Sequence, residues 1–274
     1  MAISGDLAAF ERDGFVLLPS AVQPQLTERL RRAHCRIHRE ELRSGRTAQD
    51  GSLHLLGVLG RDRAILELTD HPRILELVVA ILGWNIHIYH SHLDAHRRVA
   101  RPARRWGWHQ DGGRQNLELE TDPRPRLSIK AAVFLSDARR AGCGTIEVIP
   151  GSHERNTLPR PKRLDGAFDE PAGACPVYAA PGDVLLFDRR LWHARGVNVA
   201  GPVRRMVFLG YTYRWIRQRE PHGLPEETLA ALSPVRRQLV GAADAADGHW
   251  VPPGVELPLA AWMAERQGPS AAVG

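Results

Sequence analysis

Two short segments of this sequence place an aspartate two residues after a histidine, His92-Leu93-Asp94 and His109-Gln110-Asp111. In a β-strand, residues i and i+2 point to the same face, so each segment could offer an imidazole and a carboxylate to one ion. His193 could complete a set of two histidines and one carboxylate, which suits Fe(II) because it leaves coordination positions open for substrate and dioxygen. One such match is expected by chance among 13 histidines, so the residues alone leave both pairs open.

An arginine follows His193 across a turn marked by Asn198, at the start of an apolar stretch that predicts a strand. An antiparallel return of this strand would bring Arg204 back near the metal, where its guanidinium could bind a carboxylate through two hydrogen bonds. Arg205 makes this assignment ambiguous by one residue. Side chains alternate along a strand, however, so we expect Arg205 on the opposite face.

The elements that must position these residues change in character near residue 84. Before it the apolar spacing is mostly helical, around one short strand predicted over 15–19. After it, short apolar stretches alternate with Pro, Gly and Asp turn signals, which predicts strands. The expected helices lie at 7–10, from 26 to 45 and over 72–83, and the expected strands lie around 86–88 and over 127–135, 145–149, 184–187 and 206–213.

These patterns predict a mainly β fold, a sandwich or barrel braced by helices, in a single domain over residues 1–274. A helical part would cover 5–83, the β core 85–215, and a helical C-terminal extension 216–274. In that extension, helices over 226–232 and 235–240 precede a Pro- and Ala-rich tail that we expect to be partly mobile. The Arg- and Pro-rich segment 154–176 predicts a long loop of the kind that often closes over an active site.

The basic character of the chain first suggests a nucleic-acid partner. The net charge is +6 and the pI is about 9.8, but Lys130 and Lys162 are the only lysines, so 35 of the 37 basic residues are arginine. Such a skew is explained more simply by the coding bias of a GC-rich genome. Because no helix-turn-helix, zinc-finger or RNA-binding signature accompanies the dispersed arginines, we expect no nucleic-acid partner.

Cysteine usage and hydropathy bear on the compartment. Cys35, Cys143 and Cys175 are an odd number at wide spacings, so a disulfide framework is not expected and a reducing cytoplasm is the default. No basic-then-apolar segment opens the chain, and the longest apolar stretch, 77–82, is far shorter than the ~20 residues of a membrane span. We therefore expect a cytoplasmic protein without membrane association, and the oligomeric state is left open.

Several separate motifs together resemble the phytanoyl-CoA dioxygenase family of Fe(II)/2-oxoglutarate oxygenases. They cover roughly residues 10–241, and they match the family in order and spacing as well as in residue type. The matching segments are Trp108-His109-Gln110-Asp111-Gly112-Gly113, Val133–Asp137, Gly142-Cys143-Gly144-Thr145, Val148-Ile149-Pro150-Gly151-Ser152-His153, Pro181–Asp188, His193, Asn198 and Arg204.

The resemblance chooses the second His-x-Asp pair and implies a double-stranded β-helix (jelly-roll) core. It implies that His109, Asp111 and His193 hold Fe(II), and that 2-oxoglutarate chelates the metal with its far carboxylate on Arg204. The implied reaction uses dioxygen, releases succinate and CO2, and attacks an unactivated C–H bond of a small-molecule substrate. The family also places polar cosubstrate contacts on the strand that carries His92, and Asn198 belongs to the matching distal segment.

The implied outcome is hydroxylation, which could serve as a tailoring step in bacterial natural-product or antibiotic biosynthesis. Related halogenases have Gly or Ala at the position of Asp111, so its retention favours hydroxylation or another oxidative step. The same site could catalyse desaturation, oxidative cyclisation or epimerisation, since all share the hydrogen-abstraction step. A non-catalytic metal-binding jelly-roll or a nucleic-acid-binding protein is the alternative of another class, and neither explains Arg204 at its spacing.

The densest basic run precedes the metal segment and bears on the substrate. It consists of Arg97, Arg98, Arg101, Arg104 and Arg105. A solvated loop face is the simpler interpretation. The functional alternative is that this run attracts an anionic substrate, such as a carboxylic acid or a carrier-linked or CoA-linked acid.

Overall fold

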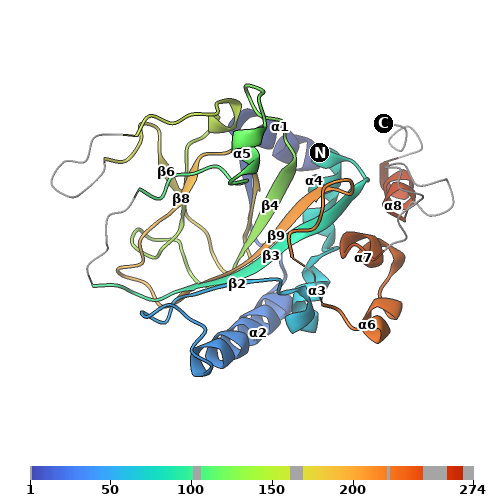
Figure 1. The fold of residues 1–274 in the computed structure, drawn as a ribbon, viewed down its shortest axis with the longest axis horizontal. Coiled ribbons are helices and arrows are strands. Elements are labelled where there is room, and N and C mark those ends of the chain that lie inside the picture. The colour runs from blue at the N-terminus through green and yellow to red at the C-terminus, as the bar shows by residue number, and fades with distance from the viewer. Residues whose placement is uncertain (1, 101–105, 161–168, 221–222, 243–257, 268–274) are drawn as a thin grey trace.

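Two antiparallel sheets form the centre of the fold (Figure 1). The computed structural model describes residues 2–100, 106–160, 169–220, 223–242 and 258–267. The larger sheet has six strands in the order β1-β7-β4-β9-β3-β2, and the smaller has three in the order β6-β5-β8. The strands are β1 Phe15–Leu18, β2 Leu53–Leu56, β3 Ile86–His96, β4 Ser128–Phe134, β5 Ile146–Val148, β6 Cys175–Val177, β7 Val184–Asp188, β8 His193–Arg195 and β9 Arg204–Tyr213.

The two faces of the large sheet meet different partners, as β4 illustrates. Ile129, Ala131 and Val133 belong to the apolar core that the sheet forms with the helices. Ala132 and Phe134 belong to a second core, which the large sheet forms with the small one. Because side chains alternate along a strand, Lys130 lies on the same face as Ala132, between the two sheets.

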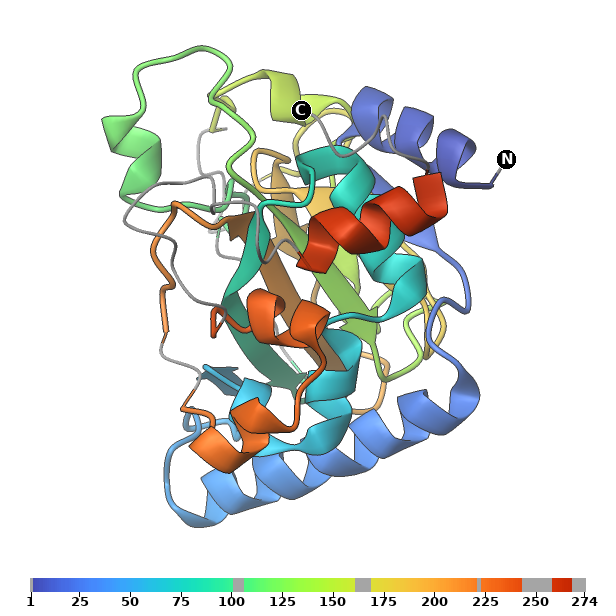
Figure 2. The ribbon, with the colours of Figure 1, turned by 90° about the vertical axis from the view of Figure 1, so that its right-hand side faces the viewer.

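Helices cover the outer face of the large sheet, and Figure 2 shows α4, α7 and α8 in front of it. The α-helices are α1 Ala2–Asp13, α2 Pro24–Arg43, α3 Arg63–Leu68, α4 Pro72–Leu82, α5 Gln115–Glu118, α6 Glu226–Ala230, α7 Pro234–Leu239 and α8 Pro258–Gln267. Two short 3₁₀ turns, η1 Leu59–Arg61 and η2 Ser152–Glu154, complete the assignment for these residues.

Local sequence signals explain where α2 and α4 begin and where α4 ends. α2 and α4 each start with a proline, whose fixed φ and missing N–H suit the first helical position. α4 ends at Gly83, which has a φ of 78° that side-chain-bearing residues rarely adopt. The buried positions of α2 include Leu30, Ala33 and Ile37, which have the predicted helical spacing.

The expectation of a mainly β fold with flanking helices is confirmed, and β1, β4, β5, β7, β9, α6 and α7 lie within about two residues of their predicted bounds. Within the predicted helical extension, residues 258–267 form a further helix, α8, whose bounds were not predicted. Leu259, Ala260 and Met263 of this helix join the outer core, and the backbone N–H of Leu259 donates to Gln238 Oε1 at 3.3 Å. Docking on α7 therefore forms a helix where local composition did not predict one.

Three further expectations concern the loop 154–176, the cysteines and membrane spans. The predicted loop 154–176 ends earlier than expected, because Cys175 and Pro176 belong to β6, and residues 161–168 lie outside the described residues. All three cysteines are free, as predicted. In the described part of the chain, no helix is both long and apolar enough to cross a bilayer.

A fully buried histidine joins α2 to the large sheet. Nε2 of His34 lies 2.9 Å from the carbonyl oxygen of Asp94, and Nδ1 lies 3.3 Å from Arg205 Nη1. A carbonyl only accepts, so Nε2 carries the proton. Burial, with a smaller contribution from Arg205, lowers the pKa of His34 to about 4.

We predict that His34 makes the protein acid-sensitive. The unfolded chain binds a proton at this residue near its ordinary pKa of 6.5 and the folded chain only near about 4, so stability falls as the pH drops between these values. At pH 5 the loss from this group is about 2 kcal/mol relative to neutral pH. Urea unfolding at both pH values should show a smaller acid loss in His34→Gln than in wild type. Equal losses would contradict this assignment.

Candidate metal centre

His109, Asp111 and His193, here called the triad, converge at one end of the small sheet. One ligand atom from each lies within 4.8 Å of the other two. The backbone N–H of His109 donates to the carbonyl of His193 at 3.0 Å, and the N–H of His193 donates back to the carbonyl of His109 at 3.0 Å. The N–H of Asp111 donates to the carbonyl of Arg189 at 2.8 Å. Backbone pairing thus brings together residues that are 78 and 84 positions apart.

Both imidazoles of the triad are oriented by backbone carbonyls. Nδ1 of His109 lies 2.8 Å from the carbonyl oxygen of Gly107, and Nδ1 of His193 lies 2.9 Å from that of Leu191. Since a carbonyl accepts, each Nδ1 carries the proton and each Nε2 keeps its lone pair. Nε2 of His109 lies 4.0 Å from Asp111 Oδ1. This is the tautomer that a metal-binding histidine adopts when its other nitrogen is fixed by a carbonyl.

The charge states also suit a cation. Burial, with a smaller contribution from His109, lowers the pKa of His193 to about 4, so its imidazole is neutral near pH 7. Burial by itself would raise the pKa of Asp111, but Lys130 and the two triad histidines hold it well below its usual range. His193 therefore presents a neutral imidazole and Asp111 a carboxylate, beside the imidazole of His109.

Lys130 is a site residue that the sequence reasoning missed. Its Nζ lies 2.8 Å from Asp111 Oδ2, and both side chains are largely buried. Burial lowers the pKa of Lys130, but the Asp111 carboxylate more than offsets this and the pKa is raised. The signal was a lone charged residue inside the apolar stretch 127–135, whose alternation would have placed it facing the small sheet.

The two neighbouring arginines of β9 point to opposite faces of the large sheet, as alternation predicted. Arg204 is buried, and its Nη1 lies 3.4 Å from Asp94 Oδ2. Arg205 instead reaches α2, where its Nη1 lies 3.0 Å from Nδ1 of His38. Burial lowers the pKa of Arg204 to about 10, which leaves its guanidinium charged near pH 7. Of these two arginines, only Arg204 lies on the inner face of the large sheet, which is the face turned toward the small sheet.

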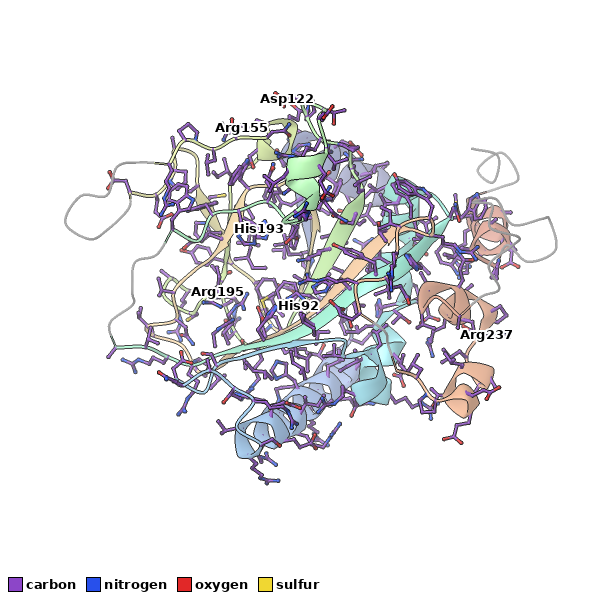
Figure 3. All side chains as sticks on the ribbon, in the orientation of Figure 1. His92, Asp122, Arg155, His193, Arg195 and Arg237 are labelled. Atoms are coloured by element: carbon purple, nitrogen blue, oxygen red, sulfur yellow. The ribbon has the colours of Figure 1, made fainter. Side chains whose placement is uncertain are left out.

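The other His-x-Asp pair forms a second cluster on the large sheet. His92 and Asp94 of β3 lie with His54 of β2, and one ligand atom of each lies within 4.8 Å of the other two. The Asp94 carboxylate already has close partners, since His54 Nδ1 lies 2.7 Å from Oδ1 and Arg204 approaches Oδ2. The His92 ring stacks on Phe208 at 4.2 Å between centroids. In Figure 3, His193 lies toward the small sheet and His92 on the large one.

The other predicted site residues have simpler surroundings. Asn198 fixes the turn between β8 and β9: its Nδ2 donates to the carbonyls of His96 at 3.1 Å and Pro202 at 2.6 Å, and its Oδ1 accepts from Gly201 N. These contacts hold backbone, so a cosubstrate role for Asn198 stays a prediction. Of the basic run, Arg101, Arg104 and Arg105 lie outside the described residues.

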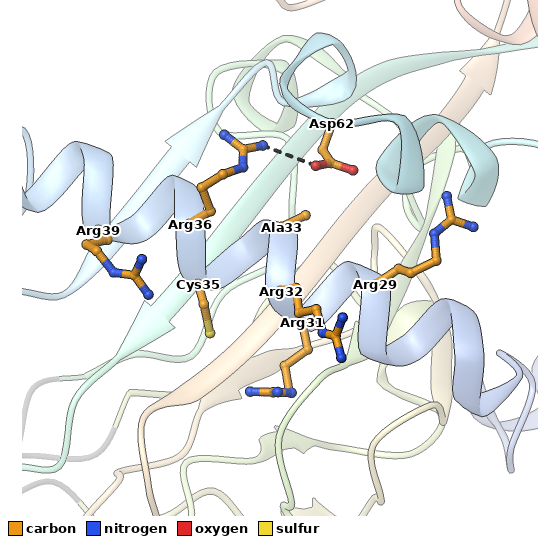
Figure 4. A pocket seen from close by; sticks show the side chains of 8 residues that line it. All are labelled: Arg29, Arg31, Arg32, Ala33, Cys35, Arg36, Arg39 and Asp62. Atoms are coloured by element: carbon orange, nitrogen blue, oxygen red, sulfur yellow. Dashed lines mark hydrogen bonds and ion pairs between the residues drawn. The ribbon is translucent and has the colours of Figure 1, made fainter.

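A hollow of about 660 Å³ lies on the surface of α2 (Figure 4). Its lining is rich in arginine, but most of these guanidinium groups are already paired. Arg31 and Arg32 both contact Glu28, and Arg36 contacts Glu40 and Asp62. A solvated helix face accounts for this hollow, because paired exposed charges leave little attraction for an anionic partner.

The residues fit a metal and a dicarboxylate cosubstrate. Two imidazoles and one carboxylate match the ligand set of non-haem Fe(II) oxygenases. Arg204 adds a buried donor, Nε, that has no hydrogen-bond partner among the described residues. An unmet donor on a buried guanidinium is costly, and a bound carboxylate would satisfy it.

Comparison with known proteins agrees with this geometry. Residues 10–206 match the family model described as phytanoyl-CoA dioxygenase (PhyH). This span contains all three residues of the triad and Arg204. It covers well over half of the chain.

Two solved structures share the fold. EctD from S. alaskensis, determined with bound Fe, is 21% identical with a TM-score of 0.61, and the match covers 81% of each chain. AviO1 from Streptomyces viridochromogenes Tue57 is 22% identical with a TM-score of 0.56, covering 76% of this chain and 94% of AviO1. Identities this low show likeness of fold, which confirms the expected jelly-roll core with flanking helices.

Curated relatives match over shorter segments. Dioxygenase cdmD of Talaromyces verruculosus is 30% identical over 118 residues, which are 43% of this chain and 36% of cdmD. Uncharacterized protein Rv1501 of Mycobacterium tuberculosis is 32% identical over 108 residues, 38% of this chain and 37% of the relative. The matched segments thus span little more than a third of these relatives.

We predict that the Lys130→Met variant is destabilised in a way that a divalent cation relieves. Without metal, the variant leaves a buried carboxylate unpaired, so the free energy of unfolding should fall by about 3–5 kcal/mol. Mn(II) supplies the missing positive charge and should therefore restore more stability to the variant than it adds to wild type. Urea unfolding in EDTA and in Mn(II) measures both quantities. Equal stabilisation of the two proteins by Mn(II) would contradict the inference that Lys130 and a bound cation both neutralise the Asp111 carboxylate.

Proposed function

This chain belongs to the phytanoyl-CoA dioxygenase family, and we propose that it is a non-haem Fe(II)- and 2-oxoglutarate-dependent dioxygenase that hydroxylates a small-molecule substrate. The observation that carries the proposal is the triad, with both Nε2 lone pairs free and Arg204 buried on the facing sheet. When bound, the iron couples the oxidation of 2-oxoglutarate by dioxygen, with release of succinate and CO2, to oxidation of a substrate C–H bond.

Each residue of the site has a defined task in this proposal. His109, Asp111 and His193 hold the iron, and the carbonyls behind the two imidazoles keep their rings in position. Lys130 holds Asp111 Oδ2, which leaves Oδ1 to face the metal. Arg204 binds the far carboxylate of 2-oxoglutarate, with its unpaired Nε and its planar fork as donors.

Two further residues support the cosubstrate. His92 is buried on β3, opposite Phe208 in the strand pairing, so its ring lies on the same inner face as Arg204. We assign it a polar contact to 2-oxoglutarate. Asn198 acts through the turn that returns the chain from β8 to β9, and so helps to set the position of Arg204.

The composition of the chain supports a cellular setting for the reaction. The arginine-rich composition supports a GC-rich bacterial genome, and tailoring of a natural product such as an antibiotic in the cytoplasm is the role we propose. Retention of Asp111 as a carboxylate supports hydroxylation.

The first test of this function is the formation of succinate. Purified protein supplied with Fe(II), 2-oxoglutarate and dioxygen should release succinate, faster with a true substrate than without it. His109→Ala and Asp111→Ala should each reduce this rate by about 100-fold or more, at or beyond the loss of about 10–100-fold that removing an outer-shell partner of a metal site causes. No iron-dependent succinate above the His109→Ala level, with or without candidate substrates, would refute the enzyme assignment. Full activity of Asp111→Ala would refute its role as a ligand.

The second test separates the two arginines of β9. Arg204→Met should raise the Kd for 2-oxoglutarate in the Mn(II)-loaded protein by about 100-fold, since a charge-assisted pair of hydrogen bonds is worth roughly 3 kcal/mol. Arg205→Met is the matched control, because it removes the same charge from the opposite face. Isothermal titration calorimetry measures both constants. A larger loss in Arg205→Met than in Arg204→Met would reverse the assignment.

A further inference from the structure

Arg189 is a fully buried arginine beside the triad. It follows β7 and has an exposed fraction of 1%. Its Nη2 donates to Asn116 Oδ1 at 2.7 Å, to the carbonyl of Asp111 at 3.2 Å and to Gln115 Oε1 at 3.3 Å. Its Nη1 is buried and has no hydrogen-bond partner among the described residues.

The guanidinium of Arg189 also lacks a carboxylate. No Asp or Glu side chain of the described residues lies within ion-pair distance of it, whereas Arg204, equally buried, has Asp94. Its sequence neighbour Arg190 contacts Asp188 at 2.7 Å. A buried cation held only by amide and carbonyl oxygens is costly unless an anion joins it.

A second cation and two hydroxyl groups lie on residues that adjoin Arg189 and Asp111. Lys130 contacts the side chain of Asp111, and Arg189 contacts its carbonyl. The Tyr89 hydroxyl lies 3.3 Å from Ser128 Oγ, and the carbonyl of Ser128 accepts from the backbone N–H of Arg189.

Two glycines make this crowding feasible. A Cβ on Gly112, whose φ is 121°, would lie 1.8 Å from Arg189 Nη2, so only glycine lets the guanidinium pass beneath the segment after Asp111. A Cβ on Gly210 would lie 2.8 Å from Tyr89 Cε1, so Gly210 gives the Tyr89 ring its place. Gly210 pairs directly with Lys130 across β4 and β9.

The charges of the loaded site do not balance without another anion. Lys130 and Arg189 contribute two positive charges against one from Asp111, while Arg204 and Asp94 offset each other. A bound Fe(II) and a doubly charged 2-oxoglutarate cancel. One positive charge therefore remains beside the metal in a buried environment, where an unpaired charge is unfavourable.

We propose that Arg189 and Lys130 form an oxyanion site for the primary substrate, which is therefore a carboxylic acid bound with its carboxylate on Arg189 Nη1. This inference rests on the proposed function, since it concerns the substrate of the same metal site. The Tyr89 hydroxyl is a further donor to the carboxylate. The segment between Asp111 and Asn116, which Arg189 also holds, joins the carboxylate site to the metal.

The alternative is that Arg189 only supports the segment after Asp111 through Nη2. That role needs the three Nη2 contacts and no anion. The two interpretations differ in whether the loaded protein discriminates a carboxylate from a neutral molecule of the same shape.

The experiment uses the Mn(II)-loaded protein saturated with 2-oxoglutarate, and benzoate and benzamide as probes. Mn(II) replaces iron so that no turnover occurs, and saturation with 2-oxoglutarate keeps the probes off Arg204. Calorimetry measures the affinity of each probe, and melting temperatures report folding. The variants are Arg189→Gln, Arg189→Lys and the control Arg190→Gln, whose partner Asp188 keeps its contact with Arg126.

We expect wild type and Arg190→Gln to bind benzoate at least tenfold more tightly than benzamide. Arg189→Gln should lose this preference, and Arg189→Lys, which keeps the charge without the planar fork, should keep part of it. Equal affinity of wild type for the two probes would overturn the proposal, as would an unchanged preference in Arg189→Gln. If Arg189→Gln does not fold, wild type is compared with Arg189→Lys. A weaker preference for benzoate over benzamide in Arg189→Lys than in wild type supports the proposal, and an equal preference overturns it.

The same titrations separate this inference from the proposed function. Failure of wild type to bind Mn(II) or 2-oxoglutarate would refute the proposed function itself. Normal binding of both, without a preference for benzoate, would refute only the carboxylate site.

Discussion

Two backbone hydrogen bonds between His109 and His193 are the contacts on which the site depends. They join the end of β8 to the segment that carries Asp111, and the backbone contact of Asp111 with Arg189 extends the same pairing. Because these bonds belong to the main chain, they fix the spacing of the three side chains before any ion binds. The carbonyls behind each imidazole then set the tautomers, so that the site is organised by the fold rather than by the metal.

The two faces of the large sheet have different roles, because the outer face contributes stability and the inner face carries charged residues of the site. Its outer face packs mostly apolar side chains against the helices, with Arg205 reaching His38 of α2, and this core supplies the hydrophobic stabilisation. Its inner face carries Lys130 and Arg204 among apolar neighbours, where each would be unfavourable alone. Each is paired with a carboxylate, of Asp111 and Asp94 respectively. Arg189, at the end of β7, has no such partner in the described part of the chain, and this difference motivates the proposed substrate site.

The sequence predicted the features that rest on local patterns. Short apolar stretches between turn signals located most strands, the proline and glycine signals of α4 located its ends, and alternation placed Arg204 and Arg205 on opposite faces. Features that depend on distant contacts were not predictable. The Lys130–Asp111 pair follows from the register of β4 against β7 and β9, which no local pattern encodes. Likewise α8 forms because it packs on α7, and its own composition gave no such signal.

The central claim is that the triad, and not the cluster of His54, His92 and Asp94, holds the catalytic metal. Equilibrium dialysis under anaerobic conditions with Fe(II), followed by metal analysis, tests it directly in two variants that each remove one imidazole from one cluster. The account predicts that wild type and His92→Ala each bind one iron per chain, and that His193→Ala binds none under the same conditions. Retention of iron by His193→Ala together with its loss from His92→Ala would contradict the account.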